Sequence, residues 1–104
     1  MYILTVHFPK AKGATFDFDH FRSTHIPKIG KAFRPFGLGY GAVFRGEESV
    51  GGGDPAYFAL MVLSFESEKG ARDAVASEAG KAALEEVAGF TDVTPVMQFS
   101  TAVE

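Results

Sequence analysis

The chain has 104 residues with a hydrophobic fraction of 46%, and it contains 11 Phe but no Cys and no Trp. Its length predicts one domain, residues 1–104. Ten basic and 13 acidic residues are interspersed and give a net charge of −3, so no basic surface exists for phosphate contacts and we expect no nucleic-acid partner. The lack of Cys excludes disulfides and thiolate metal sites.

No apolar run in the sequence approaches the roughly 20 residues of a membrane-spanning helix. Residues 1–8 show no basic segment and no small-residue cleavage site of the kind that marks a secretory signal. We therefore expect a cytoplasmic protein that does not enter a membrane.

The first predicted element is a strand over residues 2–8, YILTVHF. β-branched and aromatic residues dominate it, and Pro9, which cannot donate to a sheet, follows.

A helix is predicted to begin at Asp17. Its carboxylate suits the N-cap position, and Phe16 and Phe21 have the spacing of a hydrophobic staple. Pro27 removes a backbone N–H and disfavours helical geometry in the residue before it. We expect the helix to kink or break near residues 23–27 and to continue to about Phe33.

His25 is the unexplained residue of this helix. On a helical wheel it lies in the middle of an apolar side formed by Phe18, Phe21, Ile29, Ala32 and Phe36, with Phe33 at the edge. A buried imidazole needs a polar partner. One interpretation is a general base or ligand contact in a pocket between this helix and a sheet, where burial keeps the imidazole neutral. The other is a structural histidine bonded to a carbonyl that Pro27 leaves free.

Further elements follow in the second half of the chain. Residues 38–45 predict a strand, residues 46–55 a flexible connection, and residues 57–65 an interior strand that is apolar on both faces. Ser67 is expected to cap a short helix, with Ser77 and Gly80 interrupting it before a second helical stretch over residues 78–87. Residues 96–103 predict the last strand.

This order of elements is typical of a ferredoxin-like βαββαβ fold of the α+β class. It implies a four-stranded antiparallel sheet with both helical segments on one face. Either face of the strand over residues 57–65 is apolar, so the face without helices would expose a large apolar patch. We expect a second copy to cover it, giving a homodimer in which two sheets form an α+β barrel.

Four residues are candidates for ligand binding in the pocket near His25: Phe21, Arg22, Ile29 and Tyr40. Arg22 would bind a carboxylate or phenolate, or else extend over the rim of the sheet. Tyr40 would supply a phenolic hydroxyl, or else lie in the core with its tip in water. His20 is expected on the opposite side of the helix from His25. No His and carboxylate set has metal-ligand spacing, so neither a metal site nor a cofactor is expected, and Glu85 and Glu86 are interpreted as a solvated helix face.

Four runs together resemble the EthD family of dimeric α+β barrel proteins: FDFDHFRSTHIPKIG, FGLGY, FESEKGARDAVASEAG and GFTDVTPVMQ. The most characteristic pieces are His25-x-Pro27 and Phe90-Thr91-Asp92. The resemblance implies the ferredoxin-like fold and the homodimer. It also implies a role in degrading ethers such as ethyl tert-butyl ether, alongside an oxygenase system. A shared fold does not carry a shared chemistry.

Two functions stay open. In the first, the protein is an enzyme that acts on a small apolar or aromatic molecule by proton transfer or cofactor-free oxygenation, with His25 as the base. In the second, it is a non-catalytic auxiliary protein that assists a separate oxygenase. Haem binding with His25 as axial ligand is a third hypothesis, which the short chain disfavours.

Overall fold

The computed structural model describes residues 1–104. Its strands are β1 (Tyr2–Pro9), β2 (Leu38–Arg45), β3 (Tyr57–Phe65) and β4 (Val96–Ser100). Its α-helices are α1 (Phe18–His20), α2 (Ile26–Phe33), α3 (Glu68–Ala76) and α4 (Glu78–Glu85). A π-helical turn, η1 (Phe21–His25), joins α1 to α2, and 3-10 turns follow α2 as η2 (Arg34–Phe36) and α4 as η3 (Glu86–Gly89). None of the helices combines the length and the apolar character needed to span a membrane.

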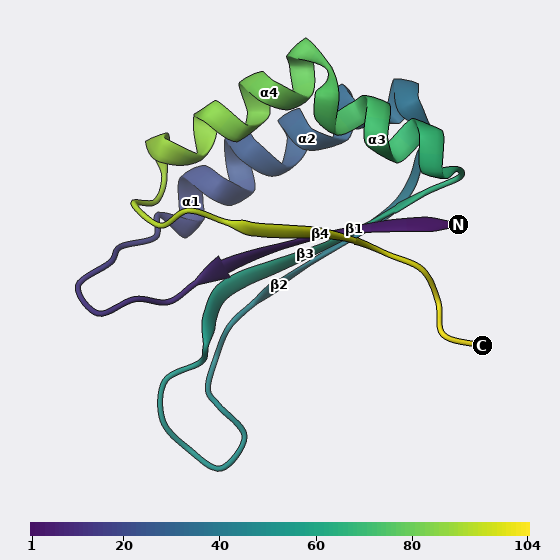
Figure 1. Cartoon of the computed structure of the whole chain (residues 1–104). Coiled ribbons are helices and arrows are strands. Elements are labelled where there is room, and N and C mark those ends of the chain that lie inside the picture. Colours follow the sequence, from purple (N-terminus) through teal and green to yellow (C-terminus); the bar gives the residue numbers. More distant parts are fainter.

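The four strands form one antiparallel sheet in the order β2-β3-β1-β4. All helices lie against one face of this sheet, as Figure 1 shows. The predicted ferredoxin-like α+β fold is therefore confirmed, and β3 occupies an interior position as its apolar sequence indicated.

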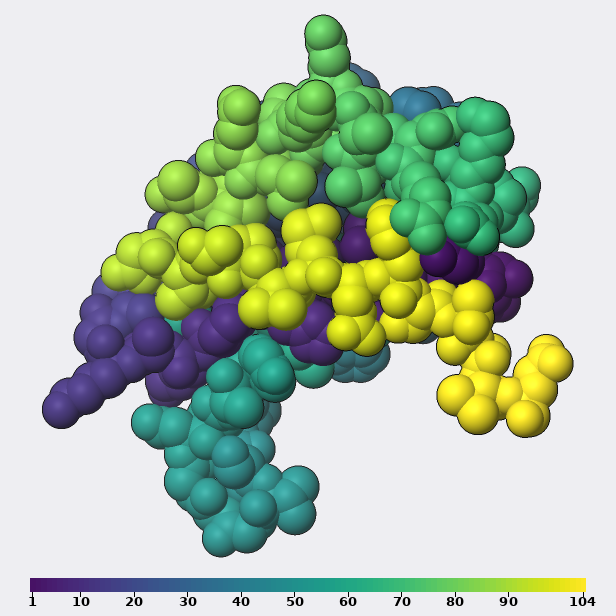
Figure 2. Space-filling model, viewed as in Figure 1, coloured from purple at the N-terminus to yellow at the C-terminus, as the bar shows by residue number.

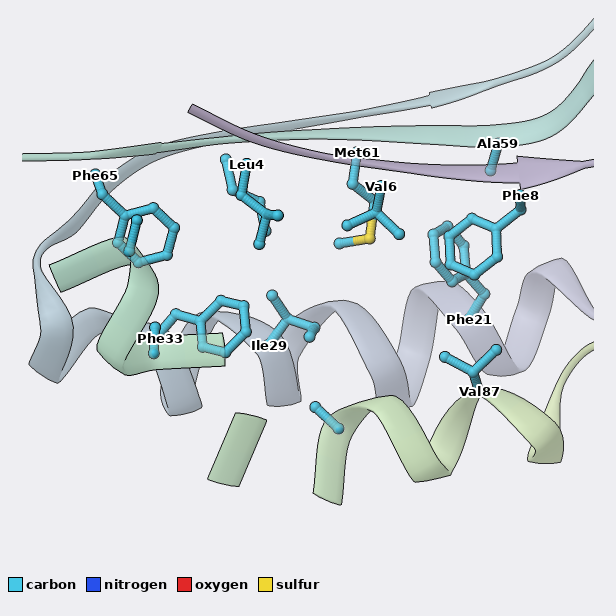
Figure 3. Packing of buried hydrophobic residues seen from close by; sticks show 14 of the residues in the cluster. Leu4, Val6, Phe8, Phe21, Ile29, Phe33, Ala59, Met61, Phe65 and Val87 are labelled. Carbon is cyan, nitrogen blue, oxygen red and sulfur yellow. The ribbon is translucent and has the colours of Figure 1, made fainter. Parts of the chain in front are cut away.

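The core fills the space between the sheet and the helices (Figure 3). From the sheet, the alternate side chains of β1 and β3 point into it; from the helical layer, Phe21, Ile29, Phe33 and Val87 meet them. Ala71, Ala74 and Ala83 are fully buried, so α3 and α4 approach the rest of the core closely, as small residues allow.

Two predicted boundaries differ from the structure. Ser77 does separate α3 from α4 and caps α4 by accepting the N–H of Gly80, but Gly80 lies inside α4 and does not interrupt it. The last strand ends at Ser100, three residues earlier than predicted. Ser100 pairs with Ile3 near the start of β1, so little of β1 remains for residues beyond it to pair with.

The sheet face opposite the helices is open and largely apolar on its β2 and β3 side. It carries Leu60 and Val62, half-buried, together with the exposed rings of Tyr40 and Phe44, which are 65% and 53% exposed. Toward β1 and β4 this open face becomes more polar, with Thr5 paired to Gln98. The expected exposed apolar surface is thus present. The connection over residues 46–56 projects from the body of the molecule (Figures 1 and 2).

Candidate functional site

The helix that carries His25 begins as its sequence predicts. Asp17 accepts the backbone N–H of His20 on Oδ1 at 3.1 Å, which is the N-cap bond, and the rings of Phe16 and Phe21 lie 5.0 Å apart. The helix does not break at Pro27. The Ile26 N–H instead donates to the Phe21 carbonyl five residues earlier, which is the hydrogen bond of a π turn. The expected break therefore takes the form of a widened turn immediately before the proline.

The π turn changes which side chains share a face. On a regular helix His20 and His25 would lie about 140° apart, and we expected them on opposite sides. In the structure both rings lie against Phe90, with centroid distances of 6.2 Å and 4.8 Å. That prediction is wrong because the extra residue in the turn rotates the positions that follow it. The same rotation buries Phe33 and leaves Ala32 only half-buried.

His25 is buried, at 2% exposure, and its polar partner is Glu86. Its Nδ1 lies 3.3 Å from Glu86 Oε1, while Glu86 Oε2 accepts a hydrogen bond from Lys28 Nζ. The Glu86 side chain is only 14% exposed, so its interpretation as part of a solvated face is wrong. The partner of His25 is a carboxylate on the C-terminal side of α4 and not a carbonyl freed by Pro27.

A signal for Glu86 is present in the sequence. At about 100° per residue, Glu86 lies about 60° from the inward-facing Ala83 on a helical wheel, whereas Glu85 lies about 160° away. The two glutamates were therefore not equivalent. The wheel places Glu86 beside the buried stripe, although it cannot say which residue it meets.

Burial and nearby charges determine the protonation of His25 and Glu86. Burial is the main cause that lowers the pKa of His25, against the opposing effect of Glu86. The hydrogen bond from Lys28 is the main cause that lowers the pKa of Glu86. An ionised carboxylate only accepts hydrogen bonds, so the hydrogen of a neutral His25 belongs on Nδ1. Its Nε2 then carries a lone pair that can accept a proton.

The Phe90-Thr91-Asp92 motif holds the other side of the imidazole in place. Thr91 Oγ1 donates to the Thr15 carbonyl at 2.7 Å, and the Thr15 N–H donates to Asp92 Oδ1 at 3.0 Å. These bonds tie the chain before β4 to the loop before α1. Phe90 is thereby fixed between that loop and His25.

His25 lines a closed, apolar cavity of about 20 Å³ between the helices and the sheet. This volume holds about one water molecule. The predicted apolar pocket beside His25 is therefore almost completely filled by side chains, because Ile29, Met61 and Val87 occupy the space around it. It has no room for a porphyrin, so the haem hypothesis does not fit these residues.

The four predicted ligand-binding residues line two adjoining hollows along β2, at the edge of the sheet. Phe21 and Arg22 line one of about 210 Å³, and Ile29 and Tyr40 line one of about 180 Å³. Tyr40 pairs with Ser64, so its side chain belongs to the open face and is not brought beside His25. Ile29 is shared by its hollow and the His25 cavity.

Arg22 lies at the rim. Its guanidinium forms an ion pair with Asp19 at 3.1 Å, and its side chain is 78% exposed. A larger hollow, about 830 Å³ and open to solvent, lies elsewhere, between the loop before α1 and residues 84–95, and His25 does not line it. No group of three or more His, Asp or Glu side chains is arranged to hold a metal ion.

No protein-family model and no curated protein sequence matches this chain significantly. Several solved structures do match it, each over 99% of the chain. An EthD-like protein from Ralstonia eutropha has a TM-score of 0.86 and 27% identity over 92% of its own length. An ethyl tert-butyl ether degradation (EthD) family protein from Bacillus halodurans has a TM-score of 0.78 and 19% identity over 99% of its length.

SnoaB, a cofactor-independent oxygenase from Streptomyces nogalater, is more distant, with a TM-score of 0.67 and 12% identity over 91% of its length. At this identity the similarity is one of fold. The Ralstonia and Bacillus structures show that the chain resembles the EthD family in fold over nearly its whole length.

Proposed function

We propose that this protein binds a small apolar or aromatic molecule and that His25 acts on it as a general base. The observation that carries the proposal is the buried His25, whose Nδ1 contacts Glu86, together with the exposed Lys28 that donates to the same carboxylate. A buried imidazole with a lowered pKa and a carboxylate on one ring nitrogen is the arrangement that general-base catalysis requires.

Each member of the group has a distinct role in this proposal. Lys28 keeps Glu86 ionised, and Glu86 accepts the Nδ1–H of His25 and so orients the ring. His25 Nε2 takes a proton from the substrate. The deprotonated substrate then continues in one of two ways, by accepting a proton at another atom or by giving electrons to dioxygen without a cofactor.

Substrate access to His25 requires side chains to move. The cavity of about 20 Å³ is separated from the hollow of about 180 Å³ at the β2 edge by side chains that line both, among them Ile29 and Met61. Methionine is unbranched and adapts its shape easily. We propose that displacement of these two side chains joins the hollow to the cavity.

The test uses 5-nitrobenzisoxazole, a small aromatic carbon acid. A base removes its ring C–H proton as the N–O bond breaks, and a coloured cyanophenolate forms. We expect the wild type to accelerate this reaction and His25→Gln to slow it by about 10²-fold or more. The wild-type rate should also fall as the pH is lowered below 6.5, because the imidazole becomes protonated. An equal rate for His25→Gln, with the fold retained, would contradict the role of His25 as base.

One observation favours the alternative of a non-catalytic auxiliary protein that assists a separate oxygenase. The space beside His25 is closed, and the His25–Glu86 contact would then serve only to hold α4 against the helix that contains η1. This alternative predicts no acceleration by the wild type, and a loss of stability as the only effect of His25→Gln.

The physiological context extends the proposal. The likeness to an ethyl tert-butyl ether degradation family protein supports a role in degrading such ethers or related small molecules, with an oxygenase system as a partner. The open apolar sheet face supports a homodimer, in which the faces of two copies meet and form a barrel. The cytoplasmic location stays a prediction.

A further inference from the structure

The hollow of about 210 Å³ at the β2 edge has a composition that separates it from the other hollows. Its seven lining residues include two phenylalanines from the helical layer, Phe18 and Phe21, and two arginines, Arg22 and Arg45. Phe44 also lines it, but its ring belongs to the open face of the sheet. No acidic residue lines it, although the chain as a whole has a net charge of −3. A locally cationic, aromatic surface on an acidic protein is the complement of an aromatic anion.

Arg45 is the cation in this hollow that has no carboxylate partner. Arg22 is ion-paired with Asp19, whereas Arg45 forms no ion pair with any carboxylate of the chain. The guanidinium of Arg45 instead lies over the Phe18 ring, 4.0 Å from its centroid. This stacking holds the guanidinium plane in place and leaves its N–H groups available.

The position of Arg45 follows from two elements. It is the last residue of β2 and pairs with Ala59 of β3, so its side chain leaves the sheet on the helix side. Phe18 is the first residue of α1, directly after the Asp17 cap. Its ring lies under the Arg45 guanidinium. The apolar wall of Ile26 and Val43 continues from this hollow into the neighbouring one of about 180 Å³.

We infer that this hollow is a binding site for a small aromatic or apolar carboxylate or phenolate, whose anionic group binds Arg45. The apolar body of the ligand lies along Ile26 and Val43 toward Ile29 and the His25 cavity. A ligand of this class would be the substrate of the proposed function. That the ligand extends toward His25 rests on the proposed function, whereas anion binding at Arg45 does not. The two hollows together fall at the lower end of the roughly 300–1,000 Å³ range of small-molecule sites, which suits a ligand of one or two rings.

The experiment is an NMR titration of the ¹⁵N-labelled protein with 2-naphthoate and, in parallel, with its neutral counterpart 2-naphthalenemethanol. We expect 2-naphthoate to shift the backbone signals of residues 18–22 and 43–45 and the Nε signal of Arg45. Arg45→Gln should weaken 2-naphthoate about tenfold, since a charge-assisted hydrogen bond is lost, and should leave 2-naphthalenemethanol unchanged.

Two matched variants test the position of the anion. Arg34→Gln removes the arginine of the neighbouring hollow, and Lys81→Gln removes a positive charge on α4; both should change the 2-naphthoate affinity less than twofold. The inference is overturned if the alcohol binds as tightly as the carboxylate. It is also overturned if either control weakens 2-naphthoate as much as Arg45→Gln, or if the shifts fall on residues 84–95.

The outcome can be read separately from that of the proposed function. His25→Gln should leave 2-naphthoate binding unchanged, because Arg45 and not His25 holds the anion. The rate with 5-nitrobenzisoxazole reports proton removal by His25, whereas the 2-naphthoate titration reports anion binding at Arg45 and needs no turnover. Failure of either assay therefore contradicts only the proposal that it tests.

Discussion

At the residue scale, the contact between His25 and Glu86 joins two segments that are 61 positions apart in the sequence. The imidazole has almost no contact with solvent, so its Nδ1–H depends on this carboxylate for a hydrogen bond. A buried polar group that loses its partner costs about 1–3 kcal/mol. Glu86 and its neighbour Glu85 allow this cost to be measured against a matched control, because the Glu86 side chain is mostly shielded from solvent and Glu85 is exposed.

We predict that Glu86→Ala lowers the free energy of unfolding by about 1–3 kcal/mol, since it leaves the His25 Nδ1–H without a partner. Glu85→Ala, at an exposed position, should change it by less than about 0.5 kcal/mol. Urea denaturation followed by circular dichroism measures both values. If the two variants were equally stable, the Glu86 contact would contribute nothing to the fold.

At the element scale, close packing between helices sets how α4 lies against the rest of the layer. Gly80 occupies the first turn of α4, where an added Cβ would lie 2.1 Å from the Ala74 carbonyl oxygen of α3. Gly80 also lines the cavity beside His25. The absence of a side chain at this position is therefore what allows α4 to carry Glu86 up to the imidazole.

We predict that Gly80→Ala destabilises the protein by about 1–3 kcal/mol or more, because the methyl group forces the α3–α4 junction apart. Gly89→Ala is the control. The nearest atom to its added Cβ is His20 Nε2 at 4.0 Å, and its φ is not positive, so its effect should stay within about 0.5 kcal/mol. Thermal or urea unfolding compares the two, and similar values for both would contradict the close approach at Gly80.

At the scale of the whole molecule, the two faces of the sheet differ in how they are covered. The helices cover one face (Figure 1). Tyr40, Phe44 and their half-buried neighbours Leu60 and Val62 lie on the other face. Contiguous apolar surface of this kind is rare on soluble monomers. A two-fold pairing of identical faces would remove it from water.

We predict that the protein sediments at about micromolar concentration as a dimer of its 11.2 kDa chain. Val62→Lys, in the middle of the open face, should give the monomer, because a charge would be buried at the interface. Lys81→Glu, on the helical layer, should leave the dimer intact. A wild type that sediments only as the 11.2 kDa species would show that no second copy covers this face.

The sequence by itself determined the features that depend on neighbouring residues. The order of strands and helices along the chain, the Asp17 and Ser67 caps, the Phe16–Phe21 staple, the burial of His25 and an irregularity before Pro27 all follow from patterns within single elements. Such patterns report directly on backbone conformation and on which face is apolar.

Only the tertiary structure decided what these features meet. The partner of His25 comes from the end of α4, and the Arg45 guanidinium stacks on a ring from α1. Of the four predicted ligand residues, Phe21 and Ile29 lie beside the imidazole, whereas Arg22 and Tyr40 lie at the β2 edge and away from it. The π turn accounts for part of this difference, because one added residue rotates every later side chain on the helix. The rest depends on how distant elements pack, since a helical wheel shows which residues face inward but not which atoms they touch.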